Sequence, residues 1–249
     1  MPARRTKPKA DVVGSIHDNA SVSEPNLAIV NDGDTLRRQP RQTRGQRRVE
    51  LLLSAAAEVI ADSGIEAATA EAIAARAKTA KGSFYQFFPN RDAVLAALAL
   101  RFTDEMRHIH ERAFPIDAHG LPLERLIDRI IRPLAEFHDR NPAFRHVFAA
   151  QEVNGDDTRA APQRLRTQLF DSFVDRLDVL FAARNPRLSA RDRRRIALVS
   201  ATIGQAVLSR RARASAAEKK PLLDETRNVL LLYLRDTLGA DPQSRRREV

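Results

Sequence analysis

The sequence predicts an all-α fold built from two helical parts. Three observations support this. Ala, Arg and Leu dominate the composition, whereas Gly occurs only 9 times and aromatic residues make up 5%. Such residues lose little entropy in a helix. Apolar side chains recur with a period near 3.6 residues, and clusters of Pro, Gly and Asn separate the periodic segments. At 249 residues with 43% hydrophobic residues, the chain is long enough to bury a sizeable core.

Residues 1–43 differ from the rest, because they mix Pro, Asp, Asn and Ser without sustained periodicity. We expect a disordered basic N-terminal extension here, and a short disordered tail over residues 240–249. The basic residues of the extension gather at its two ends, before residue 10 and after residue 36. Two interpretations stay open: a solvated tail, or an arm that follows phosphates or enters a minor groove.

The first periodic segment predicts an amphipathic helix from residue 45 to Ser63, which Gly64 would end. Its apolar stripe consists of Val49, Leu52, Leu53, Ala56, Ile60 and Ser63. Two short helices follow, one from Ala70 to Ala77 with Thr69 as its N-cap, and one from about Ala80 to Phe87. Asn90 then caps a long helix that runs to about Ala113.

The sequence predicts longer helices in the second part of the chain. We place them at residues 121–140, 142–152, 162–184, 190–213 and 217–238. Breakers separate them at Asn141-Pro142, Asn154-Gly155, Asn185-Pro186 and Gly239, and Ser189 is a good N-cap for the helix that starts at Ala190.

Charge and composition narrow the function classes. The chain has 42 basic and 32 acidic residues, a net charge of +10, which favours a polyanion as partner, although an ordinary solubility charge is the plain alternative. The longest apolar run, Ala93 to Leu100, is far too short for a membrane span, and no secretory signal follows the basic N-terminus. We therefore expect a cytoplasmic protein that does not contact a membrane.

No enzyme signature is present. The sequence lacks Cys, a Gly-rich phosphate loop and a Ser nucleophile motif, so we expect no enzyme, no catalytic residue and no cofactor. The 6 His residues form no metal-binding pattern, so no metal is predicted. His108 and His110 are interpreted as surface or satisfied histidines.

The stretch from Thr69 to Arg91 has the layout of a helix-turn-helix. Apolar residues of its first helix, such as Ile73, can pack against Phe84 and Phe88 of its second, which would enter the major groove. From Arg76 to Arg91 the chain has four bases and no acid, so this segment should lie against phosphate with little repulsion.

These residues also resemble a known family. The segment AKGSFYQFFPNRDAVLAAL, Ala80 to Leu98, is similar to the N-terminal DNA-binding domain of TetR/AcrR regulators, as is the preceding GIEAATAEAIAARA. The matching positions are Lys81, Gly82, Ser83, Phe84, Tyr85, Phe88, Arg91 and Asp92. The resemblance covers about residues 44–101. It implies a helix-turn-helix domain over 44–101 and a helical effector-binding and dimerisation domain over 102–239.

Two positions depart from the family pattern. Lys78 stands where the family commonly has Gly in the turn, and a positive φ there would cost a Lys about 1 kcal/mol. A phosphate contact from Lys78 could offset that cost. Phe87 stands where Tyr or His is common, and a phenyl ring cannot hydrogen-bond a phosphate.

The resemblance and the helical geometry together assign roles in DNA binding. Gly82 lets the backbone approach DNA closely, whereas Phe84 and Phe88 are expected in the core. Ser83 and Gln86 are the best candidates for base edges, with Phe87 a weaker one. The expected phosphate contacts are Arg44, Thr69, Lys78, Lys81, Tyr85 and Arg91. For Tyr85, a half-buried packing role is a serious alternative.

The resemblance further implies an effector pocket in the middle helices and a dimer seam in the last two. Candidate pocket residues, each of which could equally be core, are Phe102, Phe137, His138, Phe144, His146, Phe148, Phe170 and Phe173. The candidate seam, which could equally be intramolecular core, consists of Ile196, Val199, Ile203, Val207, Leu222, Leu223, Thr226, Val229, Leu230 and Tyr233.

The sequence thus favours a homodimeric regulator, most often a repressor in such a family, that binds a palindromic operator in double-stranded DNA and is released by an unknown small-molecule effector. Two alternatives stay open: architectural or non-specific nucleic-acid binding, and a TetR-like regulator controlled by a protein partner.

Overall fold

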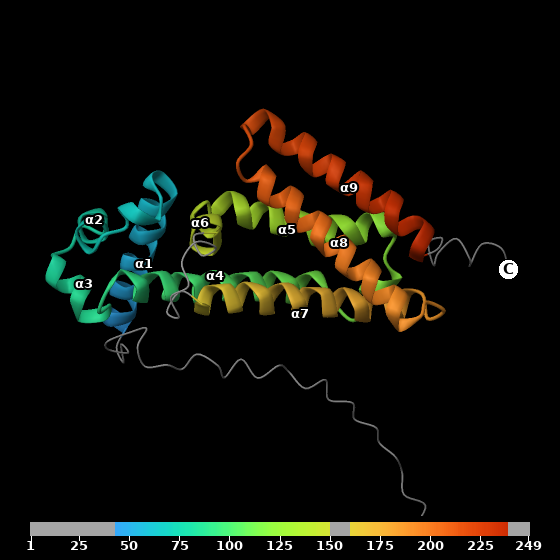
Figure 1. The fold of residues 1–249 in the computed structure, drawn as a ribbon, viewed down its shortest axis with the longest axis horizontal. Coiled ribbons are helices and arrows are strands. Elements are labelled where there is room, and N and C mark those ends of the chain that lie inside the picture. The colour runs from blue at the N-terminus through green and yellow to red at the C-terminus, as the bar shows by residue number, and fades with distance from the viewer. Residues whose placement is uncertain (1–42, 150–159, 239–249) are drawn as a thin grey trace, which may run out of the picture. The chain divides into compact units, whose positions relative to one another are not determined.

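The computed structural model describes residues 43–149 and 160–238, and these residues form helices without any strand (Figure 1). The all-α prediction is therefore confirmed. The α-helices are α1 (Thr43–Ser63), α2 (Ala70–Arg76), α3 (Lys81–Phe87), α4 (Arg91–Ala113), α5 (Leu123–Arg140), α6 (Ala143–Ala149), α7 (Ala160–Arg184), α8 (Ala190–Arg211) and α9 (Ala216–Leu238). The predicted extension and tail lie outside the described residues, and the domain boundary near residue 101 stays a prediction.

Local capping explains where several helices begin. The hydroxyl of Thr69 accepts a hydrogen bond from the Ala72 amide, and the Asn90 side chain accepts one from the Ala93 amide. Ser189 caps α8 in the same way, through the amide of Asp192. Gly64, just after α1, has φ 82°, the left-handed conformation that glycine adopts without strain. These four predictions of helix ends are confirmed.

Two short 3-10 turns were not predicted. They are η1 (Ile65–Ala67) and η2 (Ala118–Gly120), each only three residues long. A single turn of this kind has no apolar period to reveal it in a sequence. Among the described helices, none combines the length and the apolar character that crossing a bilayer requires.

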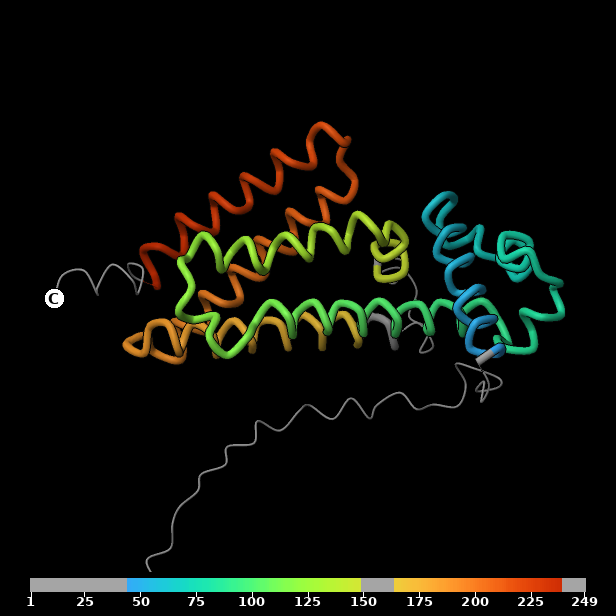
Figure 2. The backbone as a smooth tube through the Cα atoms, turned by 180° about the vertical axis from the view of Figure 1, so that it is seen from behind, coloured from blue at the N-terminus to red at the C-terminus, as the bar shows by residue number. Residues whose placement is uncertain are grey.

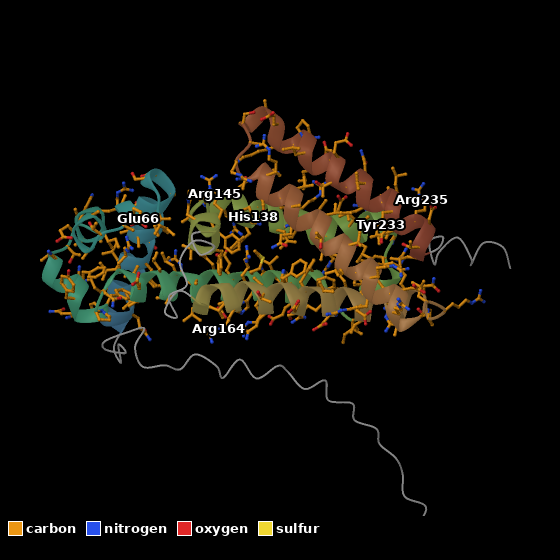
Figure 3. All side chains as sticks on the ribbon, viewed as in Figure 1. Glu66, His138, Arg145, Arg164, Tyr233 and Arg235 are labelled. Atoms are coloured by element: carbon orange, nitrogen blue, oxygen red, sulfur yellow. The ribbon has the colours of Figure 1, made fainter. Side chains whose placement is uncertain are left out.

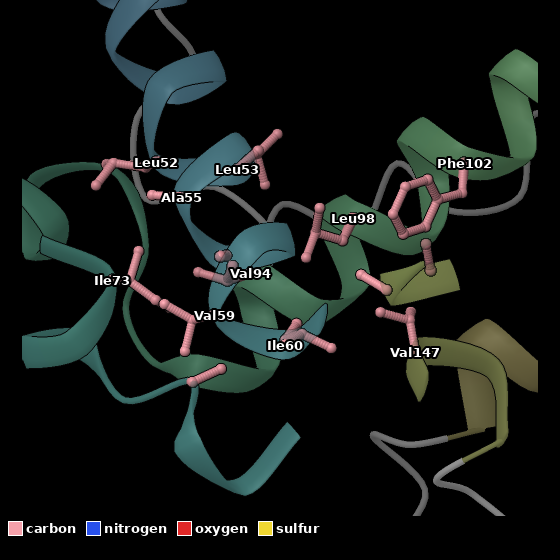
Figure 4. Close-up of a cluster of buried hydrophobic side chains, with 14 of the residues drawn as sticks. Leu52, Leu53, Ala55, Val59, Ile60, Ile73, Val94, Leu98, Phe102 and Val147 are labelled. Carbon is pink, nitrogen blue, oxygen red and sulfur yellow. The ribbon is translucent and has the colours of Figure 1, made fainter. Parts of the chain in front are cut away.

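A first hydrophobic core joins α1–α4 to α6. Figure 4 shows Leu53 and Ile60 of α1 on the side of the helix that faces Leu98 of α4, with Phe102 and Val147 further along. Val147 belongs to α6, which packs on both α1 and α4. The helix-turn-helix segment thus shares its core with α6, a helix more than fifty positions later in the sequence.

A second core is formed by α5, α7, α8 and α9 together with the end of α4. Helix α8 packs between α7 and α9, whereas α5 packs on α9 and α4 on α7 (Figure 2). Buried Leu, Ile and Val side chains such as Ile127, Leu177, Ile196 and Leu230 fill this core.

A buried arginine ties three of these helices together. The Arg211 guanidinium donates to Asp139 (2.9 Å) and to the carbonyls of Ala135 (3.3 Å) and Lys219 (2.9 Å), and the Lys219 ammonium also contacts Asp139 (2.7 Å). Burial alone would raise the pKa of Asp139, but the hydrogen bonds from Arg211 and Lys219 lower it overall. Asp139 therefore compensates a charge that is only 9% exposed.

We expect Asp139→Asn to lower the free energy of unfolding by about 2 kcal/mol, because the buried Arg211 loses its carboxylate. Urea unfolding at pH 7 measures this. The control is Asp224→Asn, which removes an exposed pair with Lys220 and should have a much smaller effect. Equal losses in the two variants would contradict the role given to Asp139.

Candidate DNA-binding surface and ligand cavity

The turn between α2 and α3 is tight and left-handed at one residue. Lys78 has φ 50°, the only positive φ of a non-glycine residue among those described. The Lys78 amide donates to the Ala75 carbonyl (3.0 Å) and the Thr79 amide to the Ala74 carbonyl (2.9 Å). The positive φ expected for Lys78 is confirmed, and its side chain is exposed.

Helix α3 has one buried and one exposed face. Phe84 and Phe88 are fully buried, with ring centroids 5.8 Å apart, which confirms their predicted place in the core. The exposed face carries Lys81, Gly82, Tyr85 and Gln86. This division follows from helical spacing, since positions 84 and 88 lie one turn apart.

The remaining α3 residues lie between these two faces. Ser83 is half-buried. Phe87 is also half-buried and packs against the first core, which leaves only part of its ring for a contact outside the chain. Tyr85 is 38% exposed, and its ring meets the ring of Phe84 edge-on. The alternative role of Tyr85 in packing therefore applies only to the side of the ring that faces Phe84.

The acid-free stretch of sequence is not acid-free in space. Lys81 forms an ion pair with Glu71 of α2, and Arg91 with Glu66 of η1 at 2.8 Å. Arg76 contacts Glu58 and Asp62 of α1 at 3.2 and 3.0 Å. The expectation of little repulsion near phosphate was therefore wrong for three of the four bases, because packing brings carboxylates from preceding elements alongside. The hydrogen bonds to these carboxylates raise the pKa values of Lys81 and Arg76.

The first turns of α1 carry the predicted Arg44 and two further basic residues, Arg47 and Arg48, that the prediction missed. Arg44 is exposed, and Arg47 and Arg48 follow at helical spacing on nearby positions. Arg48 donates to the Thr79 hydroxyl at 3.2 Å, which links α1 to the α2–α3 turn. The first turn of α1 contains no acidic residue. Cations at a helix N-terminus oppose the helix dipole, so an external anion would be favourable there. The spacing of Arg44, Arg47 and Arg48 was the signal available in the sequence.

A cavity of about 520 Å³ lies among α4–α9. Six of the predicted pocket residues line it: His138, Phe144, His146, Phe148, Phe170 and Phe173. Phe102 and Phe137 do not. They are 1% and 0% exposed, pack against each other in the first core, and both contact the cavity-lining Phe144, while Phe137 also meets His138 edge-on. For these two the prediction of pocket lining was wrong, because aromatic periodicity cannot separate a core ring from a lining ring.

Two cavity histidines are held neutral by burial. Burial lowers the pKa of His110 to about 4, helped by nearby Arg176. Burial also lowers the pKa of His138 to about 4. His110 is 6% exposed and packs against Phe173 with ring centroids 4.7 Å apart, so of the two interpretations given for it, surface or satisfied, the surface one does not hold. Figure 3 labels His138 on α5, close to Arg145 of α6. Among the described residues no cluster of three metal-binding side chains is present.

Helices α8 and α9 present apolar side chains to solvent. Leu198 is 48%, Val229 46% and Leu232 66% exposed. Of the predicted seam, Ile196 and Leu230 are instead buried in the second core, and Tyr233 is half-buried. The intramolecular alternative thus holds for part of the stripes, whereas Val229 stays available to a partner.

Comparison with known families places both halves of the chain. The family model described as "Bacterial regulatory proteins, tetR family" matches residues 52–98, which include the α2–turn–α3 unit. The model described as "Tetracyclin repressor-like, C-terminal domain" matches residues 122–234, which include most of the cavity. The chain belongs to the TetR family of transcriptional regulators.

Individual proteins are similar to this chain in part of the sequence or in the fold. The TetR-family chain is 40% identical over 60 residues to the uncharacterized HTH-type regulator YvdT of Bacillus subtilis, a match that spans 24% of this chain and 30% of that protein. A TetR-like regulator from Rhodococcus sp. RHA1 shares the fold at TM-score 0.58 and 21% identity, over 81% of this chain and 100% of that one. AibR, solved with isovaleryl coenzyme A and operator DNA, matches at TM-score 0.56 and 17% identity, over 74% of this chain and 97% of the AibR chain.

Gly82 offers a test of the exposed face of α3. A Cβ at Gly82 would meet nothing within 4 Å, so the fold of this TetR-family chain does not require glycine there. We expect Gly82→Ala to leave stability unchanged or raised by up to about 1 kcal/mol. DNA affinity should fall about tenfold, as expected when a close backbone–phosphate contact is lost.

Gel shifts on a duplex selected for binding measure that affinity. Gly120→Ala is the matched control, since its Cβ also meets open space and it lies in η2. Unchanged affinity in Gly82→Ala would contradict the close approach.

The buried histidines predict a loss of stability in mild acid. The unfolded chain protonates these imidazoles below about pH 6.5, whereas the folded chain holds them neutral to about pH 4. The free energy of unfolding should therefore be lower at pH 5.5 than at pH 7. Urea unfolding of the wild type and of His110→Leu/His138→Leu measures this. The variant should lose less than the wild type, and an identical loss would refute the assignment.

Proposed function

We propose that this TetR-family chain is a homodimeric repressor that binds a palindromic operator and is released by a small-molecule effector. The observation that carries the proposal is the divided helix α3. Phe84 and Phe88 anchor it in the core while Lys81, Tyr85 and Gln86 face outward. A short helix fixed in this way can enter a major groove without losing its own packing.

The exposed residues divide into two roles. In this proposal Lys78, Lys81, Tyr85 and Arg91 contact phosphates, with Thr69 and Arg44 at the margins, and fix the register. Gln86 and Ser83 contact base edges, and Phe87 contributes at most an apolar contact. Exposed ion pairs are weak. A DNA phosphate can therefore replace Glu71 at Lys81 and Glu66 at Arg91.

Homodimerisation would use the apolar surface of α8 and α9. Leu198, Val229 and Leu232 expose surface there that a second copy could cover. Two copies related by a two-fold axis present two α3 helices, and a palindromic operator has the same symmetry. A dimer is needed because one short recognition helix reads too few bases for specificity.

Effector release would act through α6. Phe144 and Phe148 line the cavity and also pack against the first core, where α6 contacts α1. A ligand that prefers one position of α6 would thereby favour one position of the helix-turn-helix. AibR, which was solved with both an acyl coenzyme A and operator DNA, is an example of a protein of this fold that holds both.

Selection from a randomised duplex pool near physiological salt tests the proposal. We expect an enriched inverted repeat. Enrichment should be lost with Leu232→Glu, which places a charge on the exposed α9 surface and should yield a monomer in sedimentation. Ile116→Glu, at a position 99% exposed outside the helices, is the control and should behave as the wild type.

Retention of DNA without enrichment would instead favour architectural binding, and a single half-site would refute the dimer. An inverted repeat whose binding no small molecule releases would favour control by a protein partner.

A further inference from the structure

The described residues of the cavity lining carry charge of one sign only. Among the residues that the structure describes, the charged side chains of the lining are Arg145 of α6, Arg166 of α7 and Arg213 in the α8–α9 connection, and no described Asp or Glu lines the cavity. The lining histidines do not alter this, because burial lowers the pKa values of His110, His138 and His146. The rest of the wall is mainly apolar and aromatic.

These three arginines differ from most arginines of the second core. Arg193, Arg211 and Arg227 each contact an Asp within 3.1 Å. Within residues 43–149 and 160–238, by contrast, no carboxylate pairs with Arg145, Arg166 or Arg213. Among the described residues, Arg145 donates only to the neighbouring His146 ring, at 3.1 Å. Three guanidinium groups on one cavity, with no carboxylate partner among the described residues, favour an anion, because each can donate two parallel hydrogen bonds to it.

The cavity also holds an unsatisfied hydroxyl. Ser200 is 6% exposed and lines the cavity, and its hydroxyl has no hydrogen-bond partner among the described residues. A buried hydroxyl without a partner is unfavourable, so a polar atom from a bound molecule would be stabilising there. Ser200 and Arg213 lie on opposite ends of the same lining stretch, which begins in the middle of α8 and ends in the α8–α9 connection.

Gly204 marks where this molecule would lie. It is one turn from Ser200 and one turn from Leu208, both buried on the same face of α8. A Cβ at Gly204 nevertheless meets nothing within 4 Å, although Gly204 lines the cavity. The space in front of Gly204, where α8 lines the cavity, is therefore open.

We propose that the cavity binds an anionic amphiphile, with its apolar body between α5, α7 and α8 and its negative group at Arg145, Arg166 and Arg213. This molecule would be the effector of the proposed function. Its binding in the cavity does not depend on that proposed function, and only its role in releasing the DNA rests on it. The anion could be a free carboxylate or the phosphates of an acyl coenzyme A, since both suit a guanidinium.

Two fluorescent probes that differ in one group test the charge requirement. 1-Anilinonaphthalene-8-sulfonate carries a sulfonate on a ring system that N-phenyl-1-naphthylamine has without it. Titrations use the full chain without DNA. We expect the sulfonate to bind about tenfold more tightly, the worth of a charge-assisted hydrogen-bonded pair. Equal affinity for the two probes would overturn the proposal.

Variants of the lining residues test whether the probe binds in the cavity. Arg145→Gln/Arg166→Gln/Arg213→Gln should remove the preference for the sulfonate but keep binding of the neutral probe. Arg125→Gln/Arg187→Gln/Arg191→Gln removes the same charge from exposed positions outside the lining and should keep the preference. Gly204→Leu should fill the cavity and abolish binding of both probes without lowering thermal stability. Sulfonate binding that survives Gly204→Leu, or a preference lost equally in both triple variants, would overturn the proposal.

Competition then identifies the source of the anion. Dodecanoate and dodecanoyl coenzyme A are each titrated against the bound sulfonate, and dodecan-1-ol is the neutral control. Displacement by the first alone indicates a free carboxylate, and displacement by the second alone indicates the phosphates. Equal displacement by the alcohol would refute the anionic requirement.

If the anions displace the probe but leave DNA binding unchanged, effector release fails while the anion site stands. If the chain binds no DNA at all, the proposed function fails independently of these titrations.

Discussion

The packing of α6 is the constraint on which the rest of the molecule depends. This helix spans only Ala143–Ala149, and its side chains serve two environments at once. Val147 and Phe148 complete the first core beneath α1 and α4, whereas Phe144 and Phe148 also form part of the cavity wall. Interiors are close-packed, so a wall residue cannot move without a response from the core behind it. The aromatic chain Phe102–Phe137–Phe144 continues this contact into α4 and α5.

The recognition surface, in contrast, depends on backbone geometry. The left-handed Lys78 turns the chain sharply enough for α3 to pack back on α2, and the buried pair Phe84 and Phe88 then sets the rotation of α3. With that rotation fixed, the outward positions of Lys81, Gly82, Tyr85 and Gln86 follow from the 3.6-residue period alone. The backbone strain of the positive φ thus falls on Lys78, a residue whose side chain is exposed.

Local signals in the sequence were sufficient for the helices and for the division of α3. Caps at Thr69, Asn90 and Ser189, and the glycine after Ser63, each act within four residues, so the sequence alone locates them. Contacts between distant segments could not be predicted in this way. The carboxylates beside Lys81 and Arg91, the burial of His110 and the separation of Phe137 from the cavity all arise from tertiary packing. A periodic apolar stripe shows that a face is covered, but not whether core, cavity or a second chain covers it.

The carboxylates beside the basic residues of the helix-turn-helix affect how this chain would respond to ionic strength. Glu71 and Glu66 occupy the positions at Lys81 and Arg91 that solution anions would otherwise take, so they act as built-in counterions. Binding of a polyanion normally gains entropy from released salt ions, and the logarithm of affinity falls steeply with the logarithm of salt concentration. Here part of that exchange would be internal. The slope should then be shallower than the number of phosphate contacts suggests, and affinity would vary less with the ionic conditions of the cell.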